Sequence, residues 1–299
     1  MEQDKIIVMM STYNGEKFVK EQIESILNQK NVEVKLIIRD DGSDDSTKDI
    51  INDLKNENIE LIAGNNIGWK ESFNELLRSV GACQYYAFSD QDDVWLPEKL
   101  ARGISFIKKE KVPCLYYSNA TIVDEKLNKI GIKKNKAPFS AKETNLVNCA
   151  GQGCCMVFNY AAKELFCKYR PREVFSHEAW MSILCNYFGK VFYDNHSYIL
   201  YRQHSGGNVS GAFRPSVYKL FVNYIHSIKN HSMYPHYANE ILNGYGECLD
   251  IREREIILDF ISYKRNWKSK FALIFNSALH RDSIMGTIGL KLAFLFSWF

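Results

Sequence analysis

The sequence lacks several short patterns that would assign it to a well-defined class. None of its eight cysteines stands in a C-x-x-C pair, which argues against a zinc site. No G-x-G-x-x-G run follows the first predicted strand, so we do not expect a nicotinamide dinucleotide site. There is no internal repeat, and the amino terminus lacks the basic start and long apolar stretch of a signal peptide. These features favour a cytoplasmic protein with reduced thiols.

The chain also has little excess charge, and that excess lies in one region. Its 299 residues carry a net charge of +3. Residues 215–299 contain ten Lys and Arg against seven Asp and Glu, so the first 214 residues balance to zero. A nucleic-acid-binding domain usually shows a stronger basic patch, and we expect no nucleic-acid partner. A weakly basic C-terminal segment is better suited to an anionic membrane surface.

Apolar residues form 46% of the chain, enough for a sizeable core, and their spacing predicts the secondary structure. Early apolar runs of strand length alternate with helical patterns, with strands expected at 6–10, 34–38, 59–63 and 85–89 and helices at 16–29, 46–55, 69–80 and from about 97. This alternation predicts an α/β fold whose parallel sheet has helices on both faces.

The pattern is looser in the second part of the chain. We expect short strands at 115–118, 155–158, 191–193 and 198–201, and a helix at 178–188 that ends at Gly189. Mostly helices follow from residue 216. The sequence therefore predicts a catalytic domain at 1–214 and a helical region at 215–299.

Polar or acidic clusters follow three of the four early strands. They are Ser11–Gly15, Asp40–Asp45 and Asp90–Asp93. Each cluster alone fits an ordinary turn or helix cap. Because ligands bind outside the carboxyl ends of parallel strands, the three together predict one site. The two carboxylates of Asp90-x-Asp92 suit Mg²⁺ or Mn²⁺, which can in turn bind a diphosphate.

These motifs resemble glycosyltransferase family 2, a large inverting family with the GT-A fold. The resemblance is carried by Met10–Gly15, Arg39–Ser46, Asn66–Gly68, Ser72–Asn74 and Phe88–Leu100. A further group of motifs is similar to a bacterial rhamnosyltransferase-like branch of that family: His177–Trp180, Tyr201–His204 and Gly206–Val209. Together the motifs span about residues 6–211. The expected architecture is thus a GT-A domain, with a Rossmann-like and mostly parallel sheet, plus a C-terminal helical extension.

The resemblance implies roles for individual residues. It assigns binding of the donor nucleotide to Thr12, Tyr13, Asn14, Asp41, Asn66, Asp90 and Gln91. It implies a Mn²⁺ or Mg²⁺ cofactor held mainly by Asp92, with Asp90 and His204 as further ligands.

Glu178 stands where many relatives have Asp, and the resemblance implies that it is the catalytic base. Inverting transfer needs one carboxylate to take the proton of the attacking acceptor hydroxyl. For two of these residues a purely structural explanation stays open. Glu178 also suits the positive end of a helix dipole, and His204 suits an ordinary polar loop. Gly151 and Gly153 form either a floor beneath the acceptor or a plain turn.

The rhamnosyltransferase-like branch implies transfer of L-rhamnose from dTDP-L-rhamnose to a lipid-linked precursor of a cell-surface polysaccharide. UDP-glucose, UDP-galactose and UDP-N-acetylhexosamines are alternative donors. A nucleotidyltransferase would carry a glycine-rich basic loop after the first strand, and Thr12–Lys17 is not such a loop. A non-catalytic sugar-nucleotide-binding protein would be expected to lose Asp92 or Glu178, and both are present.

The last residues of the chain are strongly apolar. Ser283–Phe299 carries one charge, on Lys291, but is shorter than the roughly 20 apolar residues of a spanning helix. We expect a helix lying at the inner face of the cell membrane, with Leu290, Phe294 and Trp298 toward the acyl chains. Nearby charges would add attraction to anionic lipid: Lys264, Arg265, Lys268 and Lys270. The alternative is that these apolar residues pack on the catalytic domain or form a homodimer interface.

Overall fold

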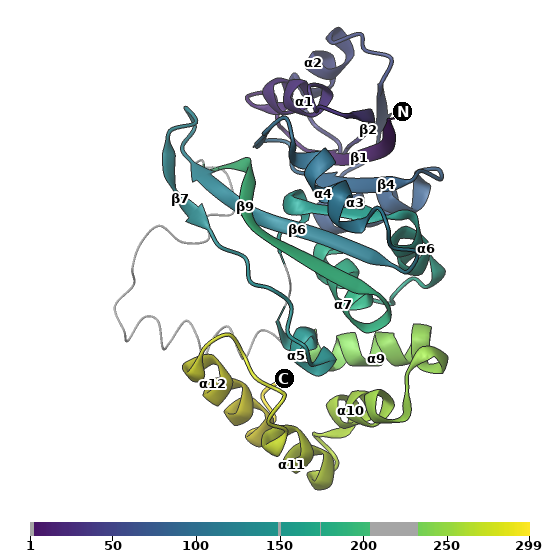
Figure 1. Ribbon diagram of the computed structural model, residues 1–299, viewed down its shortest axis with the longest axis vertical. Helices are drawn as coiled ribbons and strands as arrows, with labels where there is room; N and C mark the ends of the chain where they lie inside the picture. The colour runs from purple at the N-terminus through teal and green to yellow at the C-terminus, as the bar shows by residue number, and fades with distance from the viewer. Residues whose placement is uncertain (1–2, 149–150, 174, 204–232) are drawn as a thin grey trace. The chain divides into compact units, whose positions relative to one another are not determined.

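The computed structural model describes residues 3–148, 151–173, 175–203 and 233–299. The chain divides into two compact units (Figure 1). The first is formed by Met1–Pro138, Ala150–Lys168 and Val174–Asn208, and the second by Phe139–Cys149, Tyr169–Glu173 and Val209–Phe299. The second unit thus takes two short segments from within the predicted catalytic domain. The predicted boundary at 214 lies outside the described residues and stays a prediction.

Four parallel strands form one half of the sheet in the first unit. They are β1 (Asp4–Thr12), β2 (Val32–Asp40), β3 (Ile59–Ala63) and β4 (Tyr85–Ser89), in the spatial order β3-β2-β1-β4. All four coincide with predicted strands. The central strand β1 is covered on both faces, and its Val8, Met9 and Met10 are completely buried. Burial on both faces explains why these strands appear in the sequence as unbroken apolar runs.

The other half of the sheet, where the sequence predicted short strands without a direction, is mixed, and the predicted α/β fold with a mostly parallel sheet is confirmed. Strand β8 (Met156–Asn159) is antiparallel to β4 and to β6 (Cys114–Val123). Strand β9 (Lys190–Arg202) is parallel to β6, while β5 (Val94–Trp95) and β7 (Lys129–Lys133) pair antiparallel with β9 and β6. The strands expected at 191–193 and 198–201 are both part of β9. Its register against β6 shifts around Asn119, where a polar stretch interrupts the apolar pattern.

Helices accompany the sheet at the five predicted places, and one further helix, at 160–168, was not predicted. In the first unit they are α1 (Val19–Leu27), α2 (Thr47–Asp53), α3 (Trp69–Ser79), α4 (Lys99–Ile107), α6 (Tyr160–Lys168) and α7 (His177–Phe188). A short 3₁₀ turn, η1, covers Gly153–Cys155. Helix α1 buries Val19, Ile23 and Ile26, the helically spaced residues that predicted it. Helix α7 ends at Gly189, where any Cβ atom would lie 2.0 Å from the carbonyl oxygen of Pro113.

The described part of the second unit is helical, as predicted. Its elements are α5 (Lys142–Val147), α9 (Met233–Tyr245), the 3₁₀ turn η2 (Gly246–Cys248), α10 (Ile251–Ser262), α11 (Trp267–Phe275) and α12 (Ile284–Leu295). A capping box starts α10, because Asp250 and Glu253 each accept a hydrogen bond from the other's backbone N–H. The short α5 is tied to α10 by an ion pair of 2.5 Å between Lys142 and Glu253. Every described helix is too short or too polar to cross a bilayer.

Helix α12 buries side chains that we expected to face lipid. Leu290 is 3% exposed, Phe294 is completely buried, and Trp298 is half-buried. The ring of Phe294 packs against Phe260 and Tyr263, with ring centres 5.6 and 5.3 Å away. The expectation that these side chains enter the acyl chains was therefore wrong for Leu290 and Phe294, which belong to the core of the second unit, whereas Trp298 stacks on the exposed ring of Phe296.

Candidate active site

The three predicted polar loops meet at one edge of the sheet. Strand β1 pairs with both β2 and β4 in parallel, so the ends of all three strands lie side by side. Hydrogen bonds join the loops that follow. The backbone N–H of Asn14 donates to Ser43 at 3.0 Å, and the N–H of Tyr13 donates to the Gln91 side chain at 2.9 Å. The grouping expected from the strand order is thus a feature of the fold.

The end of β2 and the loop after it carry two buried carboxylates, Asp40 and Asp41, that accept hydrogen bonds from other groups of the protein. Asp40 accepts hydrogen bonds from the hydroxyl of Thr12 at 3.1 Å and from the backbone N–H of Ser43 at 2.9 Å. Asp41 pairs with Arg39 and accepts the backbone N–H groups of Ile67 and Gly68, both at 2.9 Å. Asp41 is 2% exposed, so its carboxylate is not available to a ligand and instead holds the loop that contains Ile67 and Gly68.

The side chains available to a ligand at this end of the site are Tyr13 and Asn66. Tyr13 is 47% exposed, and Asn66 lies in the exposed loop held by Asp41. Gly42 has a positive φ of 81°, and a Cβ there would lie 2.9 Å from the backbone nitrogen of Asn66. Only glycine therefore allows the two loops to approach so closely. Gln91 also accepts from and donates to the backbone of Tyr13, which ties β1 to β4.

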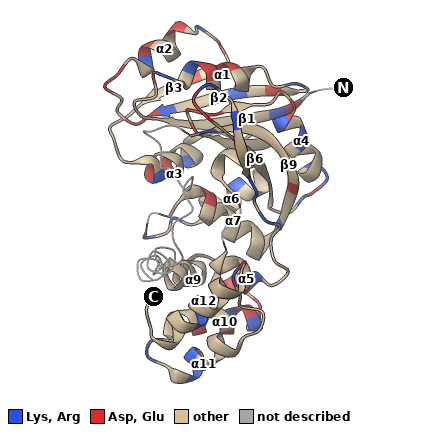
Figure 2. Cartoon of the chain, turned by 90° about the vertical axis from the view of Figure 1, so that its left-hand side faces the viewer, with Lys and Arg blue, Asp and Glu red and all other residues tan. Residues whose placement is uncertain are grey.

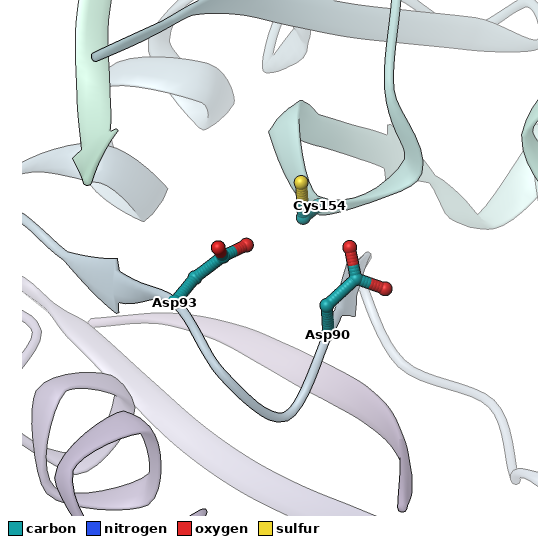
Figure 3. Close-up of side chains that lie close together, drawn as sticks. All are labelled: Asp90, Asp93 and Cys154. Carbon is teal, nitrogen blue, oxygen red and sulfur yellow. The ribbon is translucent and has the colours of Figure 1, made fainter. Parts of the chain in front are cut away.

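The loop after β4 forms an acidic cluster with a cysteine. One ligand atom each of Asp90, Asp93 and Cys154 lies within 4.8 Å of the other two, and Figure 3 shows the three side chains close together. Burial, with the charges of Asp92 and Glu178, raises the pKa of Asp90 to about 7. Burial also raises the pKa of Asp93 well above its usual range. Among the described residues, Asp93 Oδ2 has no hydrogen-bond partner.

Arg202, at the end of β9, holds this acidic loop in place. Its Nε donates to the backbone carbonyl of Asp92 at 2.8 Å, and its backbone N–H donates to Asp93 Oδ1 at 3.1 Å. The guanidinium also donates to Glu21 at 2.5 Å and lies over the ring of Phe18 at 4.5 Å. A buried arginine with this many partners fixes the backbone of the loop.

Glu178 lies in the first turn of α7, beside a buried histidine. Its charge contributes to the raised pKa of Asp90, so Glu178 lies near enough to the acidic loop to interact with it electrostatically. The Nδ1 atom of His177 is 3.3 Å from Glu178 Oε2, but neither atom has a hydrogen-bond partner among the described residues. Burial lowers the pKa of His177 to about 4, so the ring is neutral at pH 7 and the contact is not an ion pair.

The His177 ring is fixed by aromatic and backbone neighbours. Ring centres of Phe73 and Phe88 lie 4.0 and 4.3 Å from its own. A Cβ at Gly153 would lie 2.5 Å from its Nε2 atom. The His177 ring is therefore packed directly against Gly153. Because His177 is the first residue of α7, this packing holds the start of the helix that carries Glu178.

Comparison with known proteins identifies the family. The sequence profile described as Glycosyl transferase family 2 matches residues 7–166, more than half of the chain. The chain belongs to this family. It is a glycosyltransferase, and the nucleotidyltransferase alternative is excluded.

Two relatives show the range of activities named among similar proteins. The dTDP-rhamnosyl transferase RfbG of Shigella flexneri is 29% identical in an alignment of 224 residues that covers 67% of this chain and 73% of the relative. The UDP-Glc:alpha-D-GlcNAc-diphosphoundecaprenol beta-1,3-glucosyltransferase WfaP of Escherichia coli is 32% identical over 114 residues. That match covers 38% of this chain and less than half, 45%, of WfaP.

Solved structures confirm the GT-A fold of this glycosyltransferase. S. aureus TarS 1-349 in complex with UDP-GlcNAc is similar with a TM-score of 0.59 at 18% identity, over 98% of this chain and 80% of that chain. The mannosyltransferase PcManGT of Pyrobaculum calidifontis, in complex with GDP-Man and Mn²⁺, has a TM-score of 0.53 at 11% identity. It covers 99% of this chain and 88% of that chain.

The structure of this glycosyltransferase brings most, but not all, of the predicted site residues together. Thr12, Tyr13, Asn14 and Gln91 lie at the same sheet edge as the acidic loop. Asp92, expected as the main metal ligand, lies in that loop but outside the group of Asp90, Asp93 and Cys154. His204 lies outside the described residues, and its role stays a prediction.

Sequence reasoning missed several residues at the site. Asp93 was visible as the end of the acidic run, but nothing marked it as buried. Cys154 and Arg202 reach the loop from positions about 60 and 110 residues further along the chain. Arg202 lies in the Tyr201–His204 motif, but that motif gave no indication of its bonds to the loop. Lys99 was also missed. Its buried ammonium lies 3.5 Å from the centre of the Trp95 ring, and burial lowers its pKa to about 8.

Proposed function

We propose that this glycosyltransferase transfers a sugar from a nucleotide-sugar donor to a lipid-linked glycan in polysaccharide biosynthesis, with inversion at the anomeric carbon. The single observation that carries the proposal is the location of Glu178 beside the acidic loop at the carboxyl edge of the sheet. Among the described residues, one carboxylate oxygen of Glu178 has no hydrogen-bond partner. Glu178 could therefore serve as a base, next to carboxylates that could anchor a diphosphate through a cation.

The residues at the acidic loop fit a divalent cation. Asp90 and Asp93 have raised pKa values, and Asp93 has an unpaired oxygen, so a cation would relieve repulsion between the carboxylates. We assign the cation to Asp90 and Asp92, with His204 as a further candidate ligand. Asp92 is half-buried, whereas Asp93 is completely buried and bonded to Arg202, so Asp93 anchors the loop.

The thiol of Cys154 lies close to the carboxylates of Asp90 and Asp93 but is a poor ligand for a hard cation. Mn²⁺ or Mg²⁺, when bound, would offset the charge that develops on the leaving diphosphate.

Glu178 acts as the general base. Its carboxylate takes the proton of an acceptor hydroxyl while that oxygen forms a bond to the anomeric carbon of the donor sugar. The bond between the anomeric carbon and the diphosphate oxygen breaks at the same time, and the nucleoside diphosphate leaves with the bonding electron pair. The His177 ring beside Glu178 is neutral at pH 7, because burial lowers its pKa to about 4.

We propose dTDP-L-rhamnose as the donor. The support is RfbG, named as a dTDP-rhamnosyl transferase, whose similarity extends over two thirds of this chain. A UDP-hexose is the second candidate, because WfaP is named as using UDP-Glc, although its match is limited to 38% of the chain. WfaP is also named for a diphosphoundecaprenol-linked acceptor, which supports a lipid-linked acceptor and a peripheral location at the inner face of the membrane.

A panel of nucleotide sugars tests the proposal. Purified protein is incubated with dTDP-L-rhamnose, UDP-glucose, UDP-galactose or UDP-N-acetylglucosamine, with Mn²⁺ or with excess EDTA, and released nucleoside diphosphate is measured. We expect the fastest release from dTDP-L-rhamnose with Mn²⁺. Faster release from a UDP-sugar would replace the donor assignment, and equal release in excess EDTA would contradict the proposed cation.

A further inference from the structure

Exposed large apolar side chains are concentrated on and next to two neighbouring helices of the second unit. Nine of the nineteen exposed large apolar side chains in the described residues lie between Trp267 and Phe296. We call them the α11–α12 surface: Trp267, Phe271, Phe275, Ile284, Met285, Ile288, Leu292, Leu295 and Phe296. So many in one short stretch indicate an interaction surface rather than scattered apolar residues.

Helix α11 contributes a row of aromatic rings. Trp267, Phe271 and Phe275 follow one another at four-residue spacing and are 67%, 44% and 76% exposed. Their ring centres are 6.2 and 5.9 Å apart, so the rings form one continuous row. The opposite face of the helix buries Ser269 and Leu273. The row therefore faces solvent because the helix has already used its other face for packing.

Helix α12 contributes an aliphatic row without a free charge. Ile284, Ile288 and Leu292 repeat at four-residue spacing and are 81%, 48% and 39% exposed. The one charged side chain of the helix, Lys291, donates to the backbone carbonyls of Leu273 and Asn276 at 2.7 and 2.8 Å. Its ammonium thus joins the end of α11 to α12 and leaves the aliphatic row uncharged.

Basic side chains lie at the N-terminal end of the aromatic row. Lys264, Arg265 and Lys268 are exposed, and the structure pairs none of them with a carboxylate of the described residues. From Lys264 to Phe299 the chain has six Lys and Arg and a single acidic residue, Asp282. Figure 2 shows basic and no acidic residues on α11. The surface therefore combines exposed rings with an uncompensated positive charge.

We propose that the α11–α12 surface docks on the interface of an anionic lipid bilayer. Tryptophan, phenylalanine and aliphatic side chains would enter the boundary between headgroups and acyl chains, while the basic side chains contact lipid phosphates. In a two-fold dimer the same patch would face its own copy. That arrangement brings two sets of basic residues together with one acidic residue each, so a bilayer offers the better charge match.

This surface deepens the proposed place of the enzyme at the membrane. Its test uses vesicles without donor, acceptor or metal, so a failure to bind lipid is distinguishable from a failure of the proposed reaction. Full-length protein is mixed at low salt with vesicles of phosphatidylglycerol and phosphatidylethanolamine, or of phosphatidylcholine alone, and the bound fraction is measured by flotation. We expect binding to the anionic vesicles that weakens as salt is added.

Variants locate the contact. The double substitution Phe271→Ser and Phe275→Ser should lower the partition coefficient by about tenfold or more. Replacing Lys264 and Lys268 with Gln should lower it by roughly fivefold for each charge removed. Matched controls on the first unit are Ile130→Ser with Ile132→Ser, which are 58% and 47% exposed, and Lys109→Gln. Those controls should bind vesicles as the unchanged protein does.

Tryptophan quenching gives a second readout that does not depend on affinity. Brominated phospholipid should quench part of the fluorescence of the bound protein, and Trp267→Phe should remove that part while binding persists. Trp69→Phe, which removes a ring that is 47% exposed on the first unit, should leave the quenching unchanged.

Equal partition of the Phe271→Ser, Phe275→Ser protein and the unchanged protein would overturn the proposal. So would a dimer, seen by sedimentation without lipid, that these substitutions dissociate while no vesicle binding is found. Circular dichroism of each variant confirms that a loss of binding does not arise from unfolding.

Discussion

The Nε atom of Arg202 donates a hydrogen bond of 2.8 Å to the backbone carbonyl of Asp92, although the two residues are 110 positions apart in the sequence. The last residue of β9 thereby fixes the loop that carries the acidic cluster. Because a lysine presents one compact ammonium and not a planar fork, it cannot replace all the bonds that Arg202 makes.

We therefore expect Arg202→Lys to weaken the binding of the metal at the loop. The Mn²⁺ concentration for half-maximal turnover should rise by about tenfold, as for other residues that orient metal ligands. Arg102→Lys is the matched control, because Arg102 bonds to the buried Asp194 at 2.8 Å on another part of β9. An unchanged Mn²⁺ dependence in Arg202→Lys, with only a lower melting temperature, would show that its role is structural alone.

Asp92→Asn should nearly abolish Mn²⁺-dependent turnover. The amide keeps the shape of the side chain but removes the charge that holds the cation. Binding of Mn²⁺, followed by the electron paramagnetic resonance of the unbound ion, should fall in parallel. Asp44→Asn, an exposed carboxylate on the loop after β2, is the control and should change neither quantity. Full turnover of the unchanged protein in excess EDTA would rule out the metal.

Glu178→Gln should separate catalysis from donor binding. We expect turnover to fall by about 10²–10⁴-fold, the usual contribution of a general base, while the affinity for the donor stays the same. Donor affinity is measured by calorimetry with the nucleoside diphosphate. If the variant loses nucleotide binding with its activity, Glu178 belongs to the donor site instead.

Gly153→Ala should disturb the packing of His177, the residue that precedes Glu178. The new methyl group would lie 2.5 Å from Nε2 of His177, whose ring is held between Phe73 and Phe88. We expect a loss of about 1–3 kcal/mol in the free energy of unfolding, together with reduced turnover. Gly81→Ala provides the control, since a Cβ there meets nothing within 4 Å. Equal melting temperatures for the two variants would contradict the tight packing of His177.

The buried His177 should also make stability depend on pH. Its pKa is about 4 in the folded protein against 6.5 when unfolded, so the unfolded chain binds the additional proton between these values. The stability contribution is full above about pH 6.5 and is lost as the pH falls toward 4. The loss amounts to about 3 kcal/mol.

His177→Gln should flatten this part of the pH profile. Urea unfolding of both proteins at several pH values measures the difference between their free energies of unfolding. The titration of groups that both proteins share, such as the carboxylates, cancels in this difference. Parallel profiles for the two proteins would show that His177 is not buried as a neutral ring.

The sequence by itself determined the first half of the sheet and the meeting of its loops. The strands β1 to β4 are continuous apolar runs, and a parallel order places their ends at one edge without further information. The sequence could not indicate that β8 reverses direction beside β4, because pairing direction depends on contacts between distant segments. The single strand β9 was likewise hidden by the polar residues at its bulge.

Only the tertiary structure decided what surrounds the acidic loop and which face of α12 is buried. Cys154 and Arg202 come to Asp93 from separate elements, so no spacing in the sequence relates them. Helix α12 is apolar nearly all round, and a helix without a polar face gives no periodicity from which to choose its buried side. Packing against Phe260 and Tyr263 made that choice, which buried Phe294 and left Ile284, Ile288 and Leu292 exposed.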